Sequence, residues 1–244
     1  MSDNTALGDR MKRYELVTKA FLPRRSYTIV RVDGKAFHSY LRKADKPFDA
    51  EFMESMNIVT EQLCRQVSGT VFAYTQSDEI SLLLQDFASV GTEPWFGGNV
   101  QKMVSIAAAA ATGSFFWEKN PGCALFDARV FTIPDPVEVA NYFLWRQRDA
   151  VRNSISMAAQ ASFPHSQLQG LSSDRLQDKL FREKGINWSK YPDRAKRGAI
   201  CTKVHYQEGE EWRSRWEVMG SPHFDAQPDG FLASVIPELP SFKQ

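Results

Sequence analysis

The sequence predicts an α/β (α+β) protein with a ferredoxin-like β-α-β-β-α-β palm domain and an appended C-terminal α/β region. Short runs of β-branched and apolar residues, typical of strands, alternate with longer segments whose apolar residues recur at helical spacing. Two of the short runs flank a polar turn, as in a β-hairpin. The resulting order of elements is that of the split βαβ arrangement.

The first part of this core contains three predicted strands and one helix. The strands are YTIVRV at 27–32, a short run at 71–74 and an almost continuously apolar run at 80–84. The last of these is typical of a central strand that is covered on both faces. A helix is expected at 49–67 because four apolar residues recur there at helical spacing, namely Phe52, Met56, Val59 and Leu63.

The second part of the core begins with a helix at 99–117. Its many small residues favour close packing against a sheet, and a fourth strand is expected at 125–133. A further helix is predicted at 135–160, because Asp135 can cap it and Pro136 suits its first helical position.

The rest of the chain is mixed and richer in Pro, Gly and Trp. It contains a helical segment at 173–184, a strand at 199–207 and a hairpin partner at 212–219. We interpret 1–135 as a palm-like catalytic core. We interpret 136–244 as a helix plus a C-terminal region that packs on this core in one compact unit.

Composition narrows the class of protein. The formal net charge of +1 provides no overall basic signature, so any nucleic-acid binding must come from local patches. Residues 1–15 are polar, unlike a signal peptide, and the longest apolar run, at 106–111, is far too short to cross a bilayer. Three widely spaced cysteines argue against a disulfide framework and a zinc site, and favour a cytoplasmic location: Cys64, Cys123 and Cys201.

Two aspartates carry the main functional signal. In the split βαβ unit the first strand runs antiparallel beside the third, so its end, at Asp33, abuts the hairpin turn that contains Asp78. Two carboxylates brought together repel one another unless cations neutralise them. Mg²⁺ prefers such oxygen ligands, and two ions can support an in-line phosphoryl displacement. Taken singly, each aspartate also fits an ordinary turn.

The residues after Asp33 are candidates for binding a nucleotide. Gly34 allows the main chain to approach a metal or phosphate closely. The following Lys35, Ala36, Phe37 and His38 would wrap a triphosphate and its base. Phe37 fits either a stacking role on a base or an ordinary place in the core, and His38 fits a loop histidine as well as a proton donor.

Five further segments stand out along the chain: RVDGKAFHSY (31–40), AYTQSDEISLLL (73–84), FGGNVQKMVS (96–105), FDARVFTIP (126–134) and WRQRDAVRNSI (145–155). In sequence and in order they resemble segments of the tRNA(His) guanylyltransferase family and its bacterial and archaeal relatives, the reverse (3′–5′) polymerases. The first two segments together are the most specific part of the resemblance.

The resemblance implies a metal site and a nucleotide site. Two Mg²⁺ ions would be held by Asp33, the Gly34 carbonyl and Asp78. The implied nucleotide-binding residues are Asp33, Gly34, Lys35, Ala36, Phe37, His38, Ser77, Asp78 and Lys102. The implied catalytic residues are Asp33, Asp78, Glu79, Lys46 and Lys102.

Three of these residues have a further physical interpretation. Lys46 and Lys102 would lie near phosphates, and Lys102 sits early in its helix, where the helix dipole also favours an anion. Glu79 is expected to face away from Asp78, because neighbouring strand residues point to opposite sides of a sheet. We therefore expect Glu79 to hold other residues of the site in place, without binding the metal itself, or to act between subunits.

The family resemblance also implies a reaction and its partners. ATP or GTP caps a 5′-monophosphorylated tRNA, the 3′-hydroxyl of a nucleotide attacks the activated end, and pyrophosphate is later removed. The chain is expected to form a homotetramer. Polar positions linked to activity or to tRNA binding are Arg129, Asp149, Asn153, Lys196 and Arg197.

Two segments bear on the tRNA substrate. VRNSISMA at 151–158 replaces the HINNLYNT-like string of family members that recognise tRNA(His), which favours a bacterial-type enzyme that repairs truncated tRNA 5′ ends. Residues 174–203 contain nine Lys or Arg against four acids, whereas three bases and seven acids follow from 204 onward. The basic segment fits either a phosphate-tracking surface or a solvated helix face.

Two other functions remain open at this point. A palm-fold nucleotide cyclase would use the same acid pair but would not need the basic segment. A non-catalytic RNA-binding ferredoxin-like module would carry aromatic residues on its two central strands, which the runs at 27–32 and 80–84 do not provide.

Overall fold

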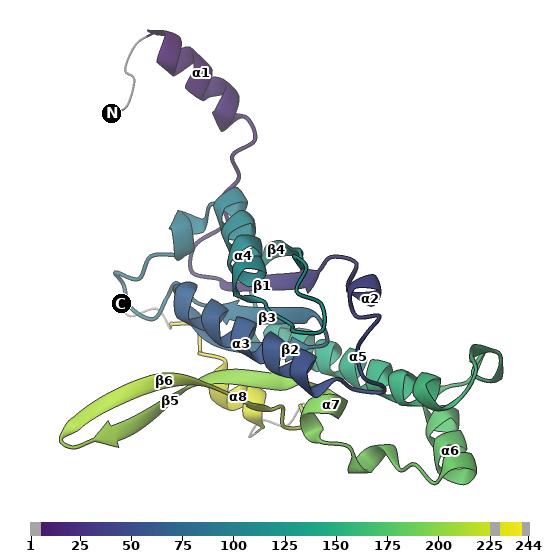
Figure 1. The fold of residues 1–244 in the computed structure, drawn as a ribbon. Helices are drawn as coiled ribbons and strands as arrows, with labels where there is room; N and C mark the ends of the chain where they lie inside the picture. Colours follow the sequence, from purple (N-terminus) through teal and green to yellow (C-terminus); the bar gives the residue numbers. More distant parts are fainter. Residues whose placement is uncertain (1–5, 225–229, 241–244) are drawn as a thin grey trace.

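A computed structural model describes residues 6–224 and 230–240 of the chain. Its centre is one antiparallel sheet in the order β4-β1-β3-β2-β5-β6 (Figure 1). The first four positions reproduce the strand order of the ferredoxin-like unit, so the predicted fold class is confirmed. The strands are β1 (Tyr27–Gly34), β2 (Thr70–Gln76), β3 (Glu79–Leu84), β4 (Phe126–Ile133), β5 (Ala199–Glu208) and β6 (Glu211–Gly220).

The helices cover both faces of this sheet. They are α1 (Ala6–Leu16), α2 (Phe37–Tyr40), α3 (Ala50–Gln66), α4 (Val100–Ser114), α5 (Pro136–Ser162), α6 (Ser173–Lys184), α7 (Asp193–Arg197) and α8 (Phe231–Val235). The structure contains every strand and long helix that the sequence predicts. Helix α1 was not predicted; it has no buried residue and projects away from the sheet (Figure 1).

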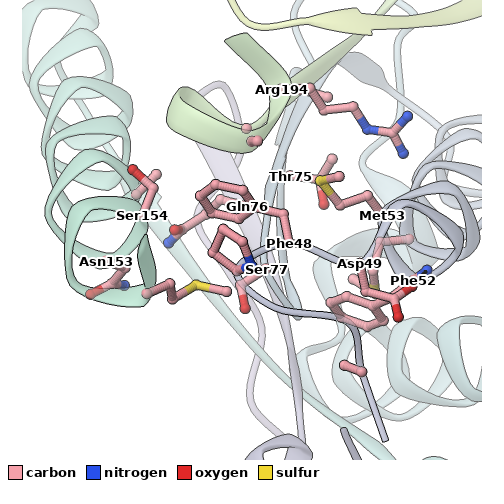
Figure 2. A pocket seen from close by; sticks show the side chains of 18 of the residues that line it. Phe48, Asp49, Phe52, Met53, Thr75, Gln76, Ser77, Asn153, Ser154 and Arg194 are labelled. Atoms are coloured by element: carbon pink, nitrogen blue, oxygen red, sulfur yellow. Dashed lines mark hydrogen bonds between the residues drawn. The ribbon is translucent and has the colours of Figure 1, made fainter. Parts of the chain in front are cut away.

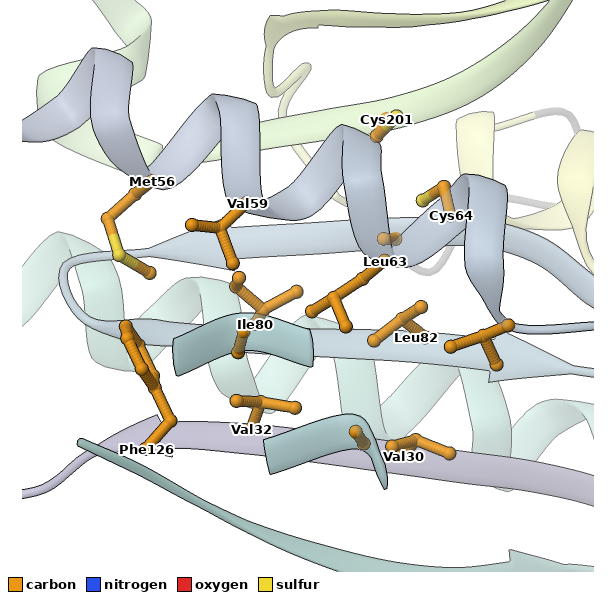
Figure 3. Close-up of a cluster of buried hydrophobic side chains, with 14 of the residues drawn as sticks. Val30, Val32, Met56, Val59, Leu63, Cys64, Ile80, Leu82, Phe126 and Cys201 are labelled. Carbon is orange, nitrogen blue, oxygen red and sulfur yellow. The ribbon is translucent and has the colours of Figure 1, made fainter. Parts of the chain in front are cut away.

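One core layer lies between the sheet and helices α3 and α4. Alternate strand residues point to opposite faces, so one set of side chains from β1 and β3 meets the apolar stripe of α3 (Figure 3). The residues of this layer include Val30, Val32, Ile80 and Leu82 of the sheet and Met56, Val59 and Leu63 of α3. The apolar spacing that predicted the helix at 49–67 therefore marks its buried face.

The opposite face of the sheet packs on α5. Here Ile29, Phe72 and Leu83 lie against Val139 and Phe143 of the helix. All six residues of β3 are buried, which confirms the prediction of a central strand covered on both sides. The predicted start of α5 is also confirmed, since the carboxylate of its N-cap residue accepts hydrogen bonds from two main-chain N–H groups of the first turn.

The residues after 136 extend the same sheet. Strand β5 pairs with β2, and β6 pairs with β5 along its whole length. Helix α6 packs on α5, and its Leu176 and Leu180 belong to the same separate apolar cluster as Ile155 of α5. The division at 135/136 falls between β4 and α5 and stays an interpretation of the sequence. Within 6–224 and 230–240, no helix has both the length and the apolar character that crossing a membrane requires.

Gly198 fixes the junction between α7 and β5. Its φ is +79°, and a Cβ there would collide with the main-chain oxygen of Thr75 on the neighbouring strand. Gly185 also has a positive φ, +68°, but has open space around it. Both glycines are therefore favoured by conformation, but only Gly198 is also required by packing.

We expect Gly198→Ala to lower the free energy of unfolding by about 3 kcal/mol or more, because it adds a main-chain collision to the strain of a positive φ. Gly185→Ala, the matched control, should cost only about 1 kcal/mol. Urea unfolding of both variants measures the difference. Equal costs would show that β2 does not approach this glycine as closely as the structure indicates.

Candidate active site

The acid pair lies where β1 ends beside the β2–β3 turn. Asp33 stands opposite Glu79 in the β1–β3 ladder, and the Gly34 N–H donates to the main-chain oxygen of Asp78 at 3.0 Å. Ser77 and Asp78 form the turn itself, and Ser77 has a φ of +50°. The chain therefore brings Asp33 and Asp78 to the same end of the sheet, where the topology of the sequence placed them.

The environment of Asp78 disfavours its charge. Burial raises the pKa of its carboxyl to about 6, and the nearby Asp33 carboxylate contributes to the same shift. Among the residues that the structure describes, Asp78 forms no ion pair with Lys, Arg or His. This half-buried carboxylate therefore has no cation from the described part of the chain beside it, which is the electrostatic situation that a bound metal ion would relieve.

The oxygen atoms at this end of the sheet fit Mg²⁺. Asp33, Asp78 and the Gly34 carbonyl are hard ligands of the kind this ion prefers. No group of three or more His, Cys, Asp or Glu side chains in the described part of the chain has metal-binding geometry. Any ion at the acid pair would therefore need further ligands from phosphates and water, as Mg²⁺ commonly does in phosphoryl-transfer sites.

Phe37 supports the site from the core. Its side chain is 2% exposed and packs against Tyr40, Phe115 and Phe126. A Cβ at Gly34 would overlap this ring, so a glycine is required at the end of β1. Of the two alternatives for Phe37, the core role is correct, because the buried ring has no face free to stack on a base.

The other residues of this segment stay accessible. Lys35 and Ala36 form an exposed turn, and Ala36 has a φ of +57°. His38 is also exposed, and one of its ring nitrogens lies 3.2 Å from the hydroxyl of Ser39. Main-chain and side-chain groups of this turn are thus open to solvent directly after the first aspartate.

Two arginines flank Asp33. A guanidinium nitrogen of Arg31 lies 3.4 Å from the Asp33 carboxylate, and one of Arg129 lies 3.9 Å from it. Arg129, predicted as a position linked to activity or tRNA, therefore lies at the acid pair. Arg31 was not predicted, although it precedes Asp33 by two residues and alternate strand residues share a face.

Glu79 is held on the α5 face of the sheet. It is 5% exposed, and both of its oxygens accept hydrogen bonds from Arg146, at 2.7 Å each. Burial raises the pKa of Glu79, and the charge-assisted bonds from Arg146 oppose that shift. The expectation that Glu79 faces differently from Asp78 agrees with this arrangement. Arg146 was overlooked, although it lies in the WRQRD segment.

A cavity opens beside the hairpin turn. It is enclosed by the loop before α3, the start of α3, the turn, α5 and α7 (Figure 2). Including its open mouth, it encloses about 800 Å³ of space. Lys46, Ser77 and Asn153 line it, so three predicted residues that are distant in sequence share one space.

Lys119 stabilises the wall of this cavity. Its ammonium group binds the carboxylates of Asp45 and Asp49 at 2.8 and 2.7 Å. Asp49 also caps α3 by accepting a hydrogen bond from the Phe52 N–H. One lysine from the loop after α4 thus fixes the loop and the helix start that line the cavity.

Other predicted residues do not reach the acid pair. Lys102 lies in the first turn of α4, which starts at the end of the sheet opposite Asp33, so one chain does not bring the two together. Asp149 is held by Arg146 and Arg152, at 3.0 and 2.6 Å. Burial would raise the pKa of Asp149, but these two arginines lower it overall.

Lys196 and Arg197, predicted to bind tRNA, form internal contacts in this chain, and their role toward tRNA stays a prediction. Lys196 is 8% exposed, and its ammonium group binds the Ser189 carbonyl at 2.6 Å and Asp193 at 3.2 Å. Arg197 is bound to the same aspartate. Both cations are therefore used inside α7 and its surroundings, where they secure the turn before β5.

Comparison with known proteins identifies the family. The family model described as tRNAHis guanylyltransferase matches residues 8–134, just over half of the chain. This chain belongs to the tRNA(His) guanylyltransferase family. It is therefore an enzyme of the nucleotidyltransferase class.

Individual relatives agree with this assignment. A bacterial tRNA(His) guanylyltransferase-like protein solved in complex with ATP is 42% identical, with a TM-score of 0.87 over 94% of this chain and 99% of that chain. A structure of such a bacterial protein with GTP is 40% identical, with a TM-score of 0.79 over 90% and 94%. The tRNA(His) guanylyltransferase of Debaryomyces hansenii is 29% identical over 80% of this chain and 81% of its own length.

The raised pKa of Asp78 predicts that its ionised carboxylate lowers the stability of the folded chain. The folded chain holds the Asp78 proton more tightly than the unfolded chain, so stability falls as pH rises from about 4 to about 6. In the absence of divalent cations, Asp78→Asn should raise the free energy of unfolding at pH 7.5 by about 1–3 kcal/mol.

Thermal melts of the wild type and Asp78→Asn in EDTA measure this effect. The gain should disappear below about pH 4, where Asp78 is protonated in both states. A melting temperature that drops equally at both pH values would contradict the desolvation cost assigned to Asp78.

Proposed function

We propose that this enzyme is a 3′–5′ nucleotidyltransferase that activates the 5′ end of tRNA with ATP or GTP and adds nucleotides there. The observation that carries this proposal is the meeting of Asp33 and Asp78 at one end of the sheet. Two arginines flank Asp33, and the turn that contains Asp78 also lines the cavity. Family membership supports the same reaction.

Asp33, Asp78 and the Gly34 carbonyl would hold two Mg²⁺ ions. When bound, these ions would stabilise phosphoryl charge and favour deprotonation of an attacking hydroxyl. Arg31 and Arg129, one half-buried and one exposed beside Asp33, would bind phosphate oxygens by charge-assisted hydrogen bonds. No protein nucleophile is needed, because positioning and electrostatic stabilisation supply the catalysis.

The cavity would hold the nucleoside part of the activating nucleotide. Ser77 joins it to the acid pair, because this turn residue lies on the cavity wall directly before Asp78. Lys46 on the same wall would bind the triphosphate. Apolar walls from Phe52 and Met56, with polar groups such as Asn153 at the edge, suit a purine.

The substrate we propose is a tRNA with an incomplete 5′ end, repaired against its opposite strand. The altered segment at 151–158 supports this choice, as does the higher identity to the bacterial proteins, 42% and 40%, than to the yeast enzyme, 29%. With Lys196 and Arg197 bound internally, the basic contact to tRNA would come from α6 and the exposed residues around it. The cytoplasmic location and the homotetramer stay predictions.

The reaction is tested with a tRNA that lacks its first 5′ nucleotide and carries a 5′-monophosphate. With all four nucleoside triphosphates and Mg²⁺, we expect extension of the 5′ end by the nucleotide that pairs with the opposing base. Sequencing of the products from four substrates that differ only in the opposing base measures the dependence on template. Addition of G to all four would refute repair and leave obligatory G addition.

Asp33→Ala and Asp78→Ala should each lower the extension rate by at least about 10³-fold, because each removes a ligand for the ions that stabilise transferred phosphate. Single-turnover rates measure the loss, and circular dichroism checks that the fold is retained. Glu61→Ala, which removes an acid from the outer surface of α3, is the matched control and should retain the wild-type rate. Near-normal rates in either aspartate variant would contradict the metal site.

A further inference from the structure

A buried bidentate ion pair between Arg146 and Glu79, called the fork below, joins α5 to β3. The Nε of Arg146 donates to one oxygen of Glu79 and its Nη2 to the other, both at 2.7 Å. The two side chains are each 6% exposed. This bidentate geometry holds the carboxylate in one plane and one orientation, which a single contact could not do.

The fork continues toward the acid pair. The same Glu79 oxygen that binds Arg146 Nη2 also binds Arg31 Nη2, at 2.8 Å. Arg31 in turn lies 3.4 Å from Asp33. A continuous chain of contacts therefore runs from α5 through Glu79 and Arg31 to the first aspartate of the metal site.

The placement of Arg31 depends on this chain. Its side chain is 17% exposed, and its Nε is buried without a hydrogen-bond partner among the described residues. Glu79 supplies its shortest ion pair, whereas the Asp33 contact is longer. Without a fixed Glu79, the guanidinium of Arg31 would lose the group that holds it between the two carboxylates.

The charges explain why two arginines share one buried acid. Glu79 alone would neutralise Arg146, and Asp149 adds a second anion on that side at 3.0 Å. Arg31 therefore shares the Glu79 carboxylate with Arg146, and its guanidinium also faces Asp33. An arriving triphosphate at the acid pair would meet this charge, in a setting where burial makes such interactions stronger than in water.

We propose that Arg146 is a positioning residue for phosphoryl transfer. By holding both oxygens of Glu79, it fixes the anchor of Arg31 and so orients the Arg31 guanidinium beside Asp33 for the phosphates of the nucleotide. Arg146 itself touches neither metal nor substrate. This inference rests on the proposed function for its kinetic readout but not for its binding readout.

The competing explanation is that the fork only fastens α5 to the sheet. The two explanations differ in what happens when both partners are replaced by apolar residues. Such a replacement often restores the stability that is lost when one partner of a buried pair is removed. It would restore activity as well only if the fork did nothing for Arg31.

The first test compares Arg146→Met with the double variant Arg146→Met/Glu79→Met. We expect the single variant to melt at a lower temperature and the double variant to recover most of that loss. The rate of 5′-end extension should stay at least about tenfold below wild type in both, with the KM for tRNA changed less than about threefold. Recovery of both stability and rate in the double variant would overturn the positioning role.

The second test keeps the charge and does not depend on recovery of the fold. Arg146→Lys retains a cation but cannot hold both oxygens of Glu79. Calorimetry with Mg²⁺ and a non-hydrolysable ATP analogue, without tRNA, should show an affinity at least about tenfold weaker than wild type. Arg148→Lys, an exposed position on the same helix, is the matched control and should bind as wild type does.

The outcomes separate the two proposals. If the wild-type chain binds the analogue but extends no tRNA, the proposed function fails while the binding comparison still tests Arg146. If Arg146→Lys binds the analogue and extends tRNA as wild type does, the positioning role fails while the proposed function stands.

Discussion

The antiparallel pairing of β1 with β3 is the constraint on which the site depends. It places Asp33 opposite Glu79 and joins Gly34 to Asp78 through a main-chain hydrogen bond. A slip of one residue would turn Asp33 to the other face of the sheet and separate it from Arg31 and Arg129. Both neighbouring layers protect this register, because β3 is buried on each of its faces.

Packing and electrostatics oppose one another at this end of the sheet. The same burial that fixes the register also removes water from Asp78 and makes its charge costly. The protein places its arginines next to Asp33 and Glu79, and within 6–224 and 230–240 no cation pairs with Asp78. Such unrelieved charge is typical of functional sites, where stability is lost so that a ligand can supply the missing counter-charge.

The fold and the acid pair could be predicted from the sequence because both follow from local patterns and a single topological rule. Apolar spacing gave the helices, and the strand order of the split βαβ unit brought Asp33 to Asp78. Side-chain partners could not be predicted in the same way. Nothing local shows that Arg146 binds Glu79, or that Phe37 turns inward behind Gly34, because these contacts depend on three-dimensional packing. The position of Arg31 beside Asp33 could have been predicted, because alternate residues of a strand share a face.

The pairing of β5 with β2 has a consequence for the aggregation of the enzyme. The last five residues of β2 are buried, and without β5 their free N–H and C=O groups would form an open, apolar sheet edge. Such edges recruit strands from other chains and promote aggregation. The C-terminal strands therefore cover the edge of β2, and a chain cut before β5 would expose this edge while it kept both residues of the acid pair.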